Sequence, residues 1–514
     1  MKMFPLHHIA AALLTLFAAH AFAAPVINEI MYRPGATYPE NEALQFIEIH
    51  NPDATPVVLT GWALTKGVDY LFPNGTTIAA GGFLVVAANP AALGVAGALG
   101  PWEAGDSLSD TGEDIVLSMP DGLGGWTSMD KVTYADEGDW ATRNFDATNG
   151  YVWTTGANWK TGIANGGRSV EMRNPLVGKN NGQNWGESAA AGGTPGAVNS
   201  NRTTNIAPII SNMKHSPAVP TTSQPVTISC DLTDESATGL SATLFWRNAT
   251  STAPGVFQTV AMTGSSAGRF TATLSPLGDK QIIEFYVSAS DGTLARTWPA
   301  PASTGQVANC QLQFDNENYA GTAAVYRQIF TGAELAAFTA VAAASDRQFN
   351  LTLVVTQGYD TTIRYRCAIR NRGNSSRNYA IRPMRISMPT DDLWDGAHDF
   401  IINPKWAYVQ LLAMRLQQAA GLPCHDSASI EVRRNGTEVT TTTQAAQDYG
   451  MLTRIEEIDG VMADKHWPLA TDAQVYRKPG SSYWASTAAA PANPDAMWSA
   501  GANRIITAST TGAT

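Results

Sequence analysis

VINEI at Val26–Ile30 and FIEI at Phe46–Ile49 are the stretches that point most directly to the fold of the N-terminal part of the chain. Both are short and rich in β-branched residues, and similar runs follow at Val57–Leu59 and Ile115–Leu117. Turn-forming dipeptides such as Asp121-Gly122 separate such runs, and helical periodicity is absent from this part of the sequence. Short sequential strands joined by tight turns predict an antiparallel β-sandwich.

The composition of the whole chain agrees with a multidomain, mainly β protein. The chain has 514 residues, with 33 Lys+Arg against 44 Asp+Glu, a formal net charge of −11, and 44% hydrophobic residues. Because a single core rarely grows beyond roughly 250–300 residues, several domains are expected. The hydrophobic content excludes a wholly disordered chain. The acidic balance argues against a nucleic-acid partner, because contact with phosphates requires a basic face.

Residues 1–23 have the order of a Sec-type signal peptide. Lys2 supplies the positive end, Ile9–Ala19 an apolar stretch, and Ala21-Phe22-Ala23 a cleavage site with small residues. The apolar stretch is too short to span a membrane, and no transmembrane segment is expected after the signal is removed. We therefore expect a secreted protein or one held at the cell surface.

The four cysteines suit an exported chain, because disulfides persist in oxidising compartments. Cys367 and Cys424 lie in the C-terminal half, and no CxxC motif indicates a zinc ribbon. Cys230 and Cys310 lie near opposite ends of one predicted β domain and could close it with a disulfide. The spacing does not determine the pairing, and buried free thiols are the alternative.

Motifs of a known family occur in order through residues 24–199. They are Ile27–Ile30, Gln45–Asn51, Gly61-Trp62, Gly112-Glu113, Gly167–Glu171, Asn184-Trp185 and Gly193–Gly196. In this order they resemble the lamin-tail domain of exported bacterial proteins, an immunoglobulin-like sandwich. The resemblance implies a recognition domain with a protein or cell-surface partner.

Carbohydrate is an alternative ligand for this region, because aromatic rings stack on sugars and the region is rich in tryptophan. Its tryptophans are Trp62, Trp102, Trp126, Trp140, Trp153, Trp159 and Trp185. Burial in the core of a sandwich explains such residues equally well.

A linker at 200–207 precedes a second set of strands at 208–315, spaced like those of a small immunoglobulin- or fibronectin-like spacer. The region 323–480 differs, because a helix-like stretch and strands alternate there. Its clearest helix is Lys405–Ala420, for which Asn403 is the expected cap. Apolar residues at intervals of three and four predict one buried face on this helix: Trp406, Val409, Leu412, Leu416 and Ala420.

Arginines are concentrated in one stretch of this third region: Arg364, Arg366, Arg370, Arg372, Arg377, Arg382 and Arg385. Even spacing along a strand would place the first four on one face. The small-residue turn at Arg372–Arg377 adds backbone donors, a combination that suits an anionic ligand such as phosphate. A solvated strand face paired with nearby acids is the alternative.

The turn sequence and the residues after it resemble a second family. Arg370–Arg377, Arg382–Ile386 and Tyr449–Met451 leading into Ile455–Asp459 are similar to the CotH family of spore-coat kinases. These atypical kinases phosphorylate secreted or surface proteins with ATP and a divalent cation, Mg or Mn. The resemblance implies that nucleotide phosphates are faced by Arg372, Arg382 and Arg385, and that Glu456 or its neighbour Glu457 orients a basic phosphate ligand. Arg382 and Arg385 stand where the family often has lysine.

Phosphoryl transfer also needs carboxylates that hold the metal and orient the acceptor. After Asp472 the printed sequence contains a single acid, Asp495, and 481–514 is of low complexity. We therefore expect no catalytic residue and no metal ligand in this chain, so that its status as an enzyme stays open. ATP and a divalent cation would be cofactors only of a completed domain.

The predicted fold is multidomain, with two antiparallel, immunoglobulin-like β-sandwiches followed by a truncated α+β domain of atypical-kinase type. The predicted function is that of an exported surface or matrix protein with a lamin-tail-like recognition domain and an inactive, ATP-binding-type region. Two alternatives remain open: the front portion of a secreted CotH-type kinase that phosphorylates extracellular or surface proteins, and a carbohydrate-binding adhesion protein.

Overall fold

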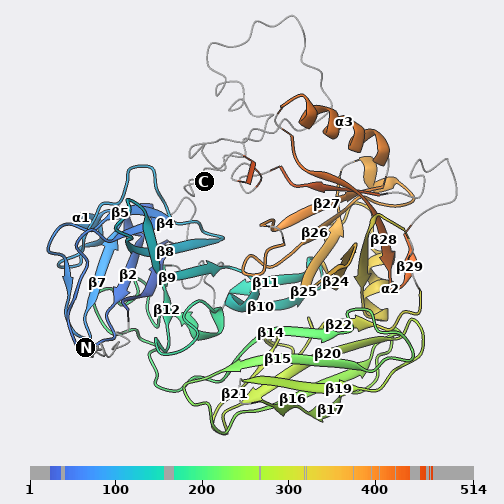
Figure 1. Cartoon of the computed structure of the whole chain (residues 1–514), viewed down its shortest axis with the longest axis horizontal. Coiled ribbons are helices and arrows are strands. Elements are labelled where there is room, and N and C mark those ends of the chain that lie inside the picture. The colour runs from blue at the N-terminus through green and yellow to red at the C-terminus, as the bar shows by residue number, and fades with distance from the viewer. Residues whose placement is uncertain are drawn as a thin grey trace, which may run out of the picture.

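A computed structural model of the chain describes residues 24–35, 41–155, 167–265, 268–317, 319, 321–373, 375–394, 396–404, 406–422, 424–439, 452–458, 462 and 465–466. The described part forms three β-rich units in chain order, seen in Figure 1 in blue, green and yellow to orange. The prediction of a multidomain, mainly β protein is therefore confirmed. The predicted signal peptide at 1–23 and tail at 481–514 lie outside the described residues. Within them, no helix has the length and apolar character needed to cross a membrane.

The first unit consists of two packed sheets. The five-stranded sheet has the order β13 (Trp185–Glu187), β12 (Val170–Met172), β1 (Val26–Met31), β2 (Phe46–His50) and β7 (Phe83–Ala87). The four-stranded sheet has the order β5 (Val68–Leu71), β4 (Ala63–Lys66), β8 (Gly112–Pro120) and β9 (Trp126–Ala135), and β3 (Val57–Val58) pairs with β6 (Thr77–Ile78). Apolar residues of both sheets share one core, in which Ile27, Ile47 and Ile115 are fully buried. This shared core is what the alternating pattern of the sequence predicts for a sandwich.

A hairpin leaves the first unit and reaches the third. Its strands are β10 (Ala141–Asp146) and β11 (Gly150–Thr155), and Figure 1 places it beside β24 and β25. The Tyr151 N–H donates to the carbonyl of Gln348 at 3.1 Å, and Gln348 N–H donates to the carbonyl of Asn149 at 2.8 Å. Arg143 is buried and donates to the carbonyls of Arg366 and Cys367. The hairpin is therefore a structural connection between two units that lie far apart in the sequence.

The second unit is also built from two sheets. One has the order β14 (Ile209–Ser216), β15 (Val226–Thr233), β19 (Arg269–Leu274) and β18 (Thr263–Gly264). The other has the order β17 (Gln258–Ala261), β16 (Ser241–Asn248), β20 (Ile282–Ser290) and β21 (Ala295–Trp298), with β22 (Cys310–Gln313) on β20. The predicted linker at 200–207 is packed rather than loose, because the Thr203 N–H donates to the carbonyl of Arg173 and Ile206 is buried.

Cys230 and Cys310 both lie fully buried in the core of this second unit, and both are free thiols. The disulfide considered from the sequence is therefore not formed in this structure. Cys367 and Cys424 are free as well. The alternative of buried thiols acting as small apolar residues describes Cys230 and Cys310.

Thiol titration tests this assignment. In denaturant and without prior reduction, all four cysteines are expected to react with Ellman's reagent, because none is in a disulfide. In the folded protein only Cys424, which is partly exposed, is expected to react readily. Burial raises the pKa of Cys230 to about 12, which leaves almost no reactive thiolate. Reaction of only two thiols in the unreduced, denatured chain would contradict the assignment.

The third unit is a closed sheet. Its strands follow the order β23 (Ala324–Ile329), β24 (Phe349–Gln357), β25 (Asp360–Asn371), β26 (Met384–Ser387), β27 (Asp399–Asn403), β30 (Leu452–Glu456) and β28 (Ser427–Arg434), with β29 (Thr437–Glu438) at the side of β28. A parallel pairing of β23 with β28 closes the ring, and apolar side chains such as Phe349, Leu351 and Ile402 fill it. The expectation of an α+β domain of kinase type finds no support here. Strands that follow one another along the chain from β23 to β27 pair with their neighbours, and the described residues of the unit also contain the α-helices α2 (Gly332–Ala340) and α3 (Ala407–Ala419).

Helix α3 occurs close to where the sequence predicts it, but its predicted buried face is wrong. The exposed fraction is 43% for Trp406, 45% for Val409, 60% for Leu412 and 62% for Leu416, and Ala420 is exposed as well. Among its described residues only Ala407 is buried, and Trp406 rather than Asn403 stands at the N-cap. Periodicity reveals an apolar stripe on a helix, but the position of the helix on the fold decides what covers that stripe.

Candidate functional site

A cavity of about 230 Å³ lies in the third unit between the sheet and helix α3. Its wall includes Arg372, which directly follows β25, and Asn403 at the end of β27. Glu456 and Glu457 at the end of β30, His425 before β28 and Gln410 of α3 also belong to the polar part of the wall. Five separate segments of the chain therefore bring charged and amide side chains to one place.

Arg372 is held in place by the turn that the sequence singled out. Its backbone N–H donates to the carbonyl of Pro383 at 2.9 Å. Gly373 has φ 95°, and a Cβ there would lie 2.1 Å from Ser376 Oγ, so the turn requires glycine. The Arg372 guanidinium Nη2 lies 3.7 Å from Glu457 Oε1, and the side chain is 24% exposed. The cation is thus both anchored and accessible from the cavity.

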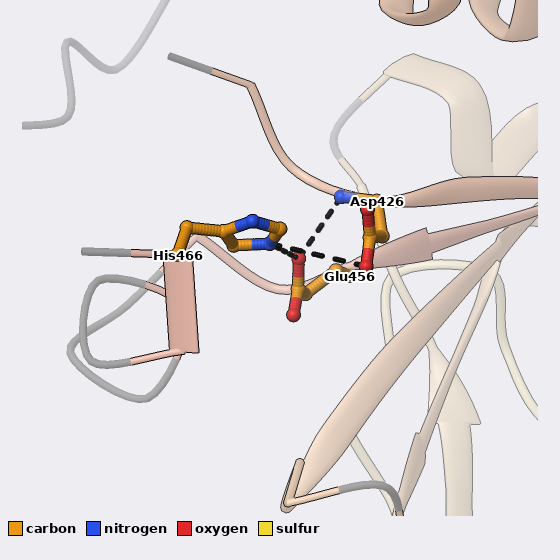
Figure 2. Close-up of side chains that lie close together, drawn as sticks. All are labelled: Asp426, Glu456 and His466. Atoms are coloured by element: carbon orange, nitrogen blue, oxygen red, sulfur yellow. Dashed lines mark hydrogen bonds and ion pairs between the residues drawn. The ribbon is translucent and has the colours of Figure 1, made fainter. Parts of the chain in front are cut away.

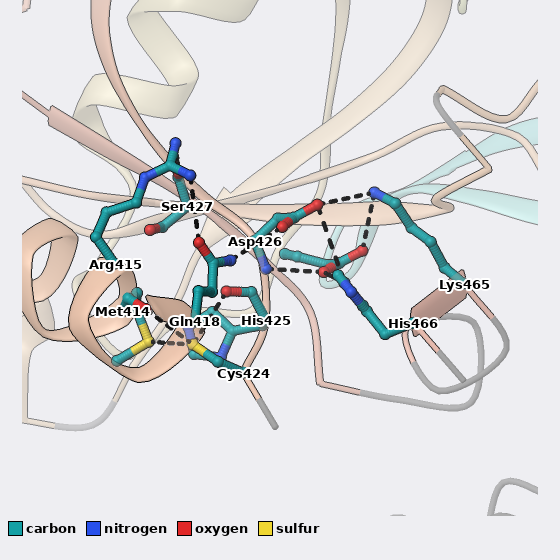
Figure 3. Close-up of polar contacts among 10 residues, drawn as sticks. Met414, Arg415, Gln418, Cys424, His425, Asp426, Ser427, Lys465 and His466 are labelled. Carbon is teal, nitrogen blue, oxygen red and sulfur yellow. Dashed lines mark hydrogen bonds and ion pairs between the residues drawn. The ribbon is translucent and has the colours of Figure 1, made fainter. Parts of the chain in front are cut away.

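Glu456 is engaged in a polar network on the other side of the cavity. Its Oε2 accepts the Asp426 N–H at 2.9 Å and lies 2.8 Å from His466 Nε2, as Figure 2 shows. The Lys465 Nζ lies 3.3 Å from Glu456 Oε1 and 3.2 Å from Asp426 Oδ2. In Figure 3 the network continues to α3 through Gln418, whose amide donates to Asp426 Oδ1 at 3.2 Å.

This network has the donor set of a cation site but already contains a cation. Asp426, Glu456 and His466 each offer one ligand atom, and those atoms lie within 4.8 Å of one another. The ammonium of Lys465 bridges the two carboxylates. Burial alone would raise the pKa of Asp426, but the hydrogen bond and charge of Lys465 outweigh burial and lower it. Electrostatically, this is a lysine-bridged carboxylate pair.

The structure separates the four residues proposed from the sequence to face a nucleotide. Arg372 and Glu456 line the same cavity. Arg382 donates from Nη1 to the carbonyl of Val341 at 2.7 Å, and Arg385 forms an ion pair with Asp399 on the neighbouring strand β27. Neither of these two arginines is part of the cavity wall.

Arg385 belongs to a separate ionic cluster at the contact with the first unit. His398 lies 2.6 Å from Asp399 and 2.9 Å from Glu137, which comes from the first unit. Burial alone would lower the pKa of His398, but its hydrogen bonds to Asp399 and Glu137 raise it to about 10. This cluster therefore joins two units, with His398 as a cation.

The single cationic face predicted for the arginine stretch is not formed. A register shift in the pairing of β24 with β25 occurs where Arg366 has φ 57°, and alternation breaks there. Most of the arginines instead meet an acid: Arg364 with Asp392, Arg366 with Asp139, Arg370 and Arg377 with Asp346, Arg372 with Glu457 and Arg385 with Asp399. The alternative of an arginine stretch paired with acids fits this arrangement better.

A junction of all three units was missed from the sequence. Asp139 of the first unit lies 2.9 Å from the Arg366 guanidinium of the third. The same carboxylate accepts the indole N–H of Trp298, from the second unit, at 2.8 Å. Asp391 accepts the backbone N–H of Asp139 at 2.6 Å. Since these residues are 159 to 252 positions apart from Asp139, no local signal could have joined them.

The lamin-tail motifs meet around buried carboxylates. Glu29 Oε1 accepts the Ser169 hydroxyl at 2.5 Å and the Thr194 N–H at 2.8 Å. Glu48 Oε2 accepts the Gly196 N–H at 2.5 Å. Both glutamates are fully buried. The motifs on β1 and β2 and the motifs at 169–196 are therefore joined in the structure, because the buried carboxylates of Glu29 and Glu48 accept hydrogen bonds from the later segment.

The comparisons with known proteins support the assignment of this first unit. The model of the Lamin Tail Domain family matches residues 18–136, which include β1 to β9. The resemblance predicted from the motifs is confirmed for this part of the chain. No curated protein matches the chain.

Among solved structures, a cycloalternan-forming enzyme from Listeria monocytogenes in complex with a pentasaccharide substrate is 14% identical, with a TM-score of 0.16. The match covers 35% of this chain and 14% of that enzyme. A likeness of this size carries no argument about fold or function.

Proposed function

We propose that this protein is an exported, multidomain surface protein whose third unit binds the phosphates of a nucleotide, ATP, at the cavity beside α3. The lamin-tail-like unit would supply recognition of a protein or cell-surface partner. The tripartite order of residues 1–23 supports export. The observation that carries the nucleotide proposal is the anchored Arg372 guanidinium at the cavity, paired with Glu457.

The chemistry of the cavity fits a phosphate group. A guanidinium offers planar, charge-assisted donors that match phosphate oxygens. The amide of Gln410, whose Oε1 accepts from Asn403 Nδ2 at 3.2 Å, adds a neutral donor to the same wall. An ion pair between a cation and a glutamate also orients the phosphate-binding side chain of ordinary kinases. At about 230 Å³ the cavity suits a phosphate chain, since whole drug-sized ligands usually fill at least about 300 Å³.

The proposal is limited to binding. A divalent cation would need carboxylate oxygens, and both acids of the described cavity wall, Glu456 and Glu457, have cationic partners. The cation that accompanies ATP would therefore be held by the phosphates themselves. We derive no transfer step from these residues.

Nucleotide titration of the chain without residues 1–23 tests this proposal. ATP is expected to bind, adenosine is not, and Arg372→Ala is expected to weaken ATP binding about tenfold or more, because a charged hydrogen bond contributes roughly 1.5–3 kcal/mol. Calorimetry with Mg and Mn present measures the affinity. Arg382→Ala is the matched control, since its guanidinium donates to Val341 outside the cavity. Equal losses in both variants, or no binding at millimolar ATP, would contradict the proposal.

A further inference from the structure

A second, wider cavity of about 800 Å³ lies between the first and second units. Its wall is made from η2 (Gly138–Trp140) and η4 (Gly182–Asn184) of the first unit and from β21 of the second. The volume lies within the range of about 300–1,000 Å³ that is usual for small-molecule sites. Domain junctions are also a preferred place for such sites.

Two guanidiniums lie in this wall without an acid of their own. Arg296 donates to the carbonyls of Gln183 at 2.8 Å and Ala207 at 2.6 Å, and its buried Nε has no partner in the described part of the chain. Arg173 forms no side-chain hydrogen bond or ion pair with the described residues. A Cβ at Gly186 would lie 2.9 Å from Arg173 Nε, so the missing side chain at that position lets the guanidinium lie against β13.

The acids near this cavity have other partners, although Glu187 Oε2 and Glu235 Oε2 are buried without a hydrogen bond in the described part of the chain. Asp139 pairs with Arg366 and accepts from Trp298, and Glu187 lies 3.5 Å from Arg168. Glu235, close to Arg296, accepts the Ile206 N–H and the amide of Asn174. Both carboxylates of the wall, Asp139 and Glu187, thus lie beside cations outside it, whereas Arg173 and Arg296 form no ion pair with an acid of the described residues.

The two arginines also disfavour each other. Burial and, after it, the charge of Arg173 lower the pKa of Arg296 to about 10, although the charges of Asp139 and Glu235 act in the opposite direction. Arg173 is exposed, and desolvation of its guanidinium against the wall also lowers its pKa. An anion in the cavity would relieve both effects, because an opposite charge stabilises the charged form of each group.

We infer that this cavity binds an acidic saccharide, whose carboxylate or sulfate group is held between Arg173 and Arg296. Guanidiniums match the planar oxygens of such groups. The amide of Asn205 and the hydroxyl of Thr203 are polar groups of the same wall that suit sugar hydroxyls, whereas the indole of Trp185 is buried in the core of the first unit. This site is separate from the proposed nucleotide site and does not depend on it.

Binding measurements on the chain without residues 1–23 test the inference. The probes are a trimer of galacturonic acid, a sulfated chondroitin disaccharide, maltotriose as the neutral sugar and inorganic phosphate. At least one acidic saccharide is expected to bind more tightly than both maltotriose and phosphate. The two acidic probes distinguish a carboxylate from a sulfate ligand. Failure of both to bind at millimolar concentration, or equal binding of maltotriose or phosphate, would overturn the inference.

Substitution of the two arginines adds an independent check. Arg173→Gln is expected to weaken saccharide binding about tenfold and to leave the melting temperature unchanged, because the side chain has no described partner to lose. Arg296→Gln is expected to weaken binding as well but also to loosen the contact with Gln183 and Ala207. Arg269→Gln, which removes an ion pair with Asp231 elsewhere in the second unit, is the matched control and should bind normally. Unchanged binding by Arg173→Gln would overturn the inference.

Discussion

The Arg366→Ala variant is expected to lose about 3–5 kcal/mol of unfolding free energy, because removing one partner of a buried ion pair leaves the other charge uncompensated. The Arg366 and Asp139 side chains are 7% and 14% exposed and lie 2.9 Å apart. The Arg366 guanidinium also lies 4.6 Å from the centre of the Trp298 ring. Denaturant unfolding followed by tryptophan fluorescence measures the effect, since an indole lies at the pair itself.

A surface ion pair of the same strand provides the control. Arg370 lies 2.9 Å from Asp346, whose side chain is 68% exposed. Arg370→Ala is therefore expected to cost less than about 1 kcal/mol. Equal losses of unfolding free energy in Arg366→Ala and Arg370→Ala would contradict the expectation that the junction of the three units stabilises the fold.

A double substitution separates two quantities: the free-energy cost of leaving one charge unpaired, and the net contribution of the ion pair to the free energy of unfolding. Combining Asp139→Ala with Arg366→Met is expected to cost less than the sum of the two single losses, because neither charge is then left alone. Gly138, next to the pair, has φ 65°, and a Cβ there would lie 1.7 Å from Asp391 Oδ1. The close approach of the first and third units at this point thus depends on glycine as well as on charge.

The first unit is expected to be less stable at about pH 9 than at about pH 5, by roughly 6 kcal/mol from Glu29 and Glu48 together. Burial, only partly offset by hydrogen bonds, raises the pKa of Glu29 from 4.5 to about 7 and that of Glu48 to about 8. Between pH 4.5 and these values the folded chain binds more protons than the unfolded chain. The stability that these two carboxyl groups contribute is therefore fully present below pH 4.5 and is lost as the pH rises through 7 and 8. Glu113 of the same unit, whose pKa burial raises to about 7, acts in the same direction.

Thermal unfolding at several pH values checks this expectation. Glu48→Gln is expected to reduce the pH dependence, because the amide fills the same space and does not ionise. Asp121→Asn is the control: Asp121 is an exposed turn residue whose pKa is lowered by backbone hydrogen bonds, so it titrates below the window. A melting temperature that rises from pH 5 to pH 9 would contradict the expectation.

Much of the first unit could be predicted from residues that are close in the sequence. The alternation in Val26–Ile30 and Phe46–Ile49 predicts strands, and in the structure Ile30 lies opposite Ile47 in the antiparallel pair β1–β2. Strand period and turn chemistry are local properties, which a single sequence displays. The same motifs supported the family resemblance that the match to residues 18–136 confirms.

The candidate site was predicted only in part. The turn after Arg372 and the acids at the end of β30 were recognised, and the fold brings Arg372 and Glu456 to one cavity. Arg382 and Arg385 were expected beside them, but Arg382, which precedes β26, donates to Val341, and Arg385, on β26, pairs with Asp399. The spacing of arginines along a chain does not determine which acceptor each side chain meets. The break in alternation at Arg366 also means that arginines before and after it do not share one face of β25.

The sequence by itself determined the β character, the order of the units and the identity of the lamin-tail-like part. Those properties depend on side-chain alternation and turn residues within a few positions. Only the tertiary structure decided that Arg366 meets Asp139, that α3 turns its apolar stripe outward, and that Arg173 and Arg296 share a cavity. Charge interactions act over a few ångströms in space, and folding brings groups to that distance irrespective of their separation along the chain.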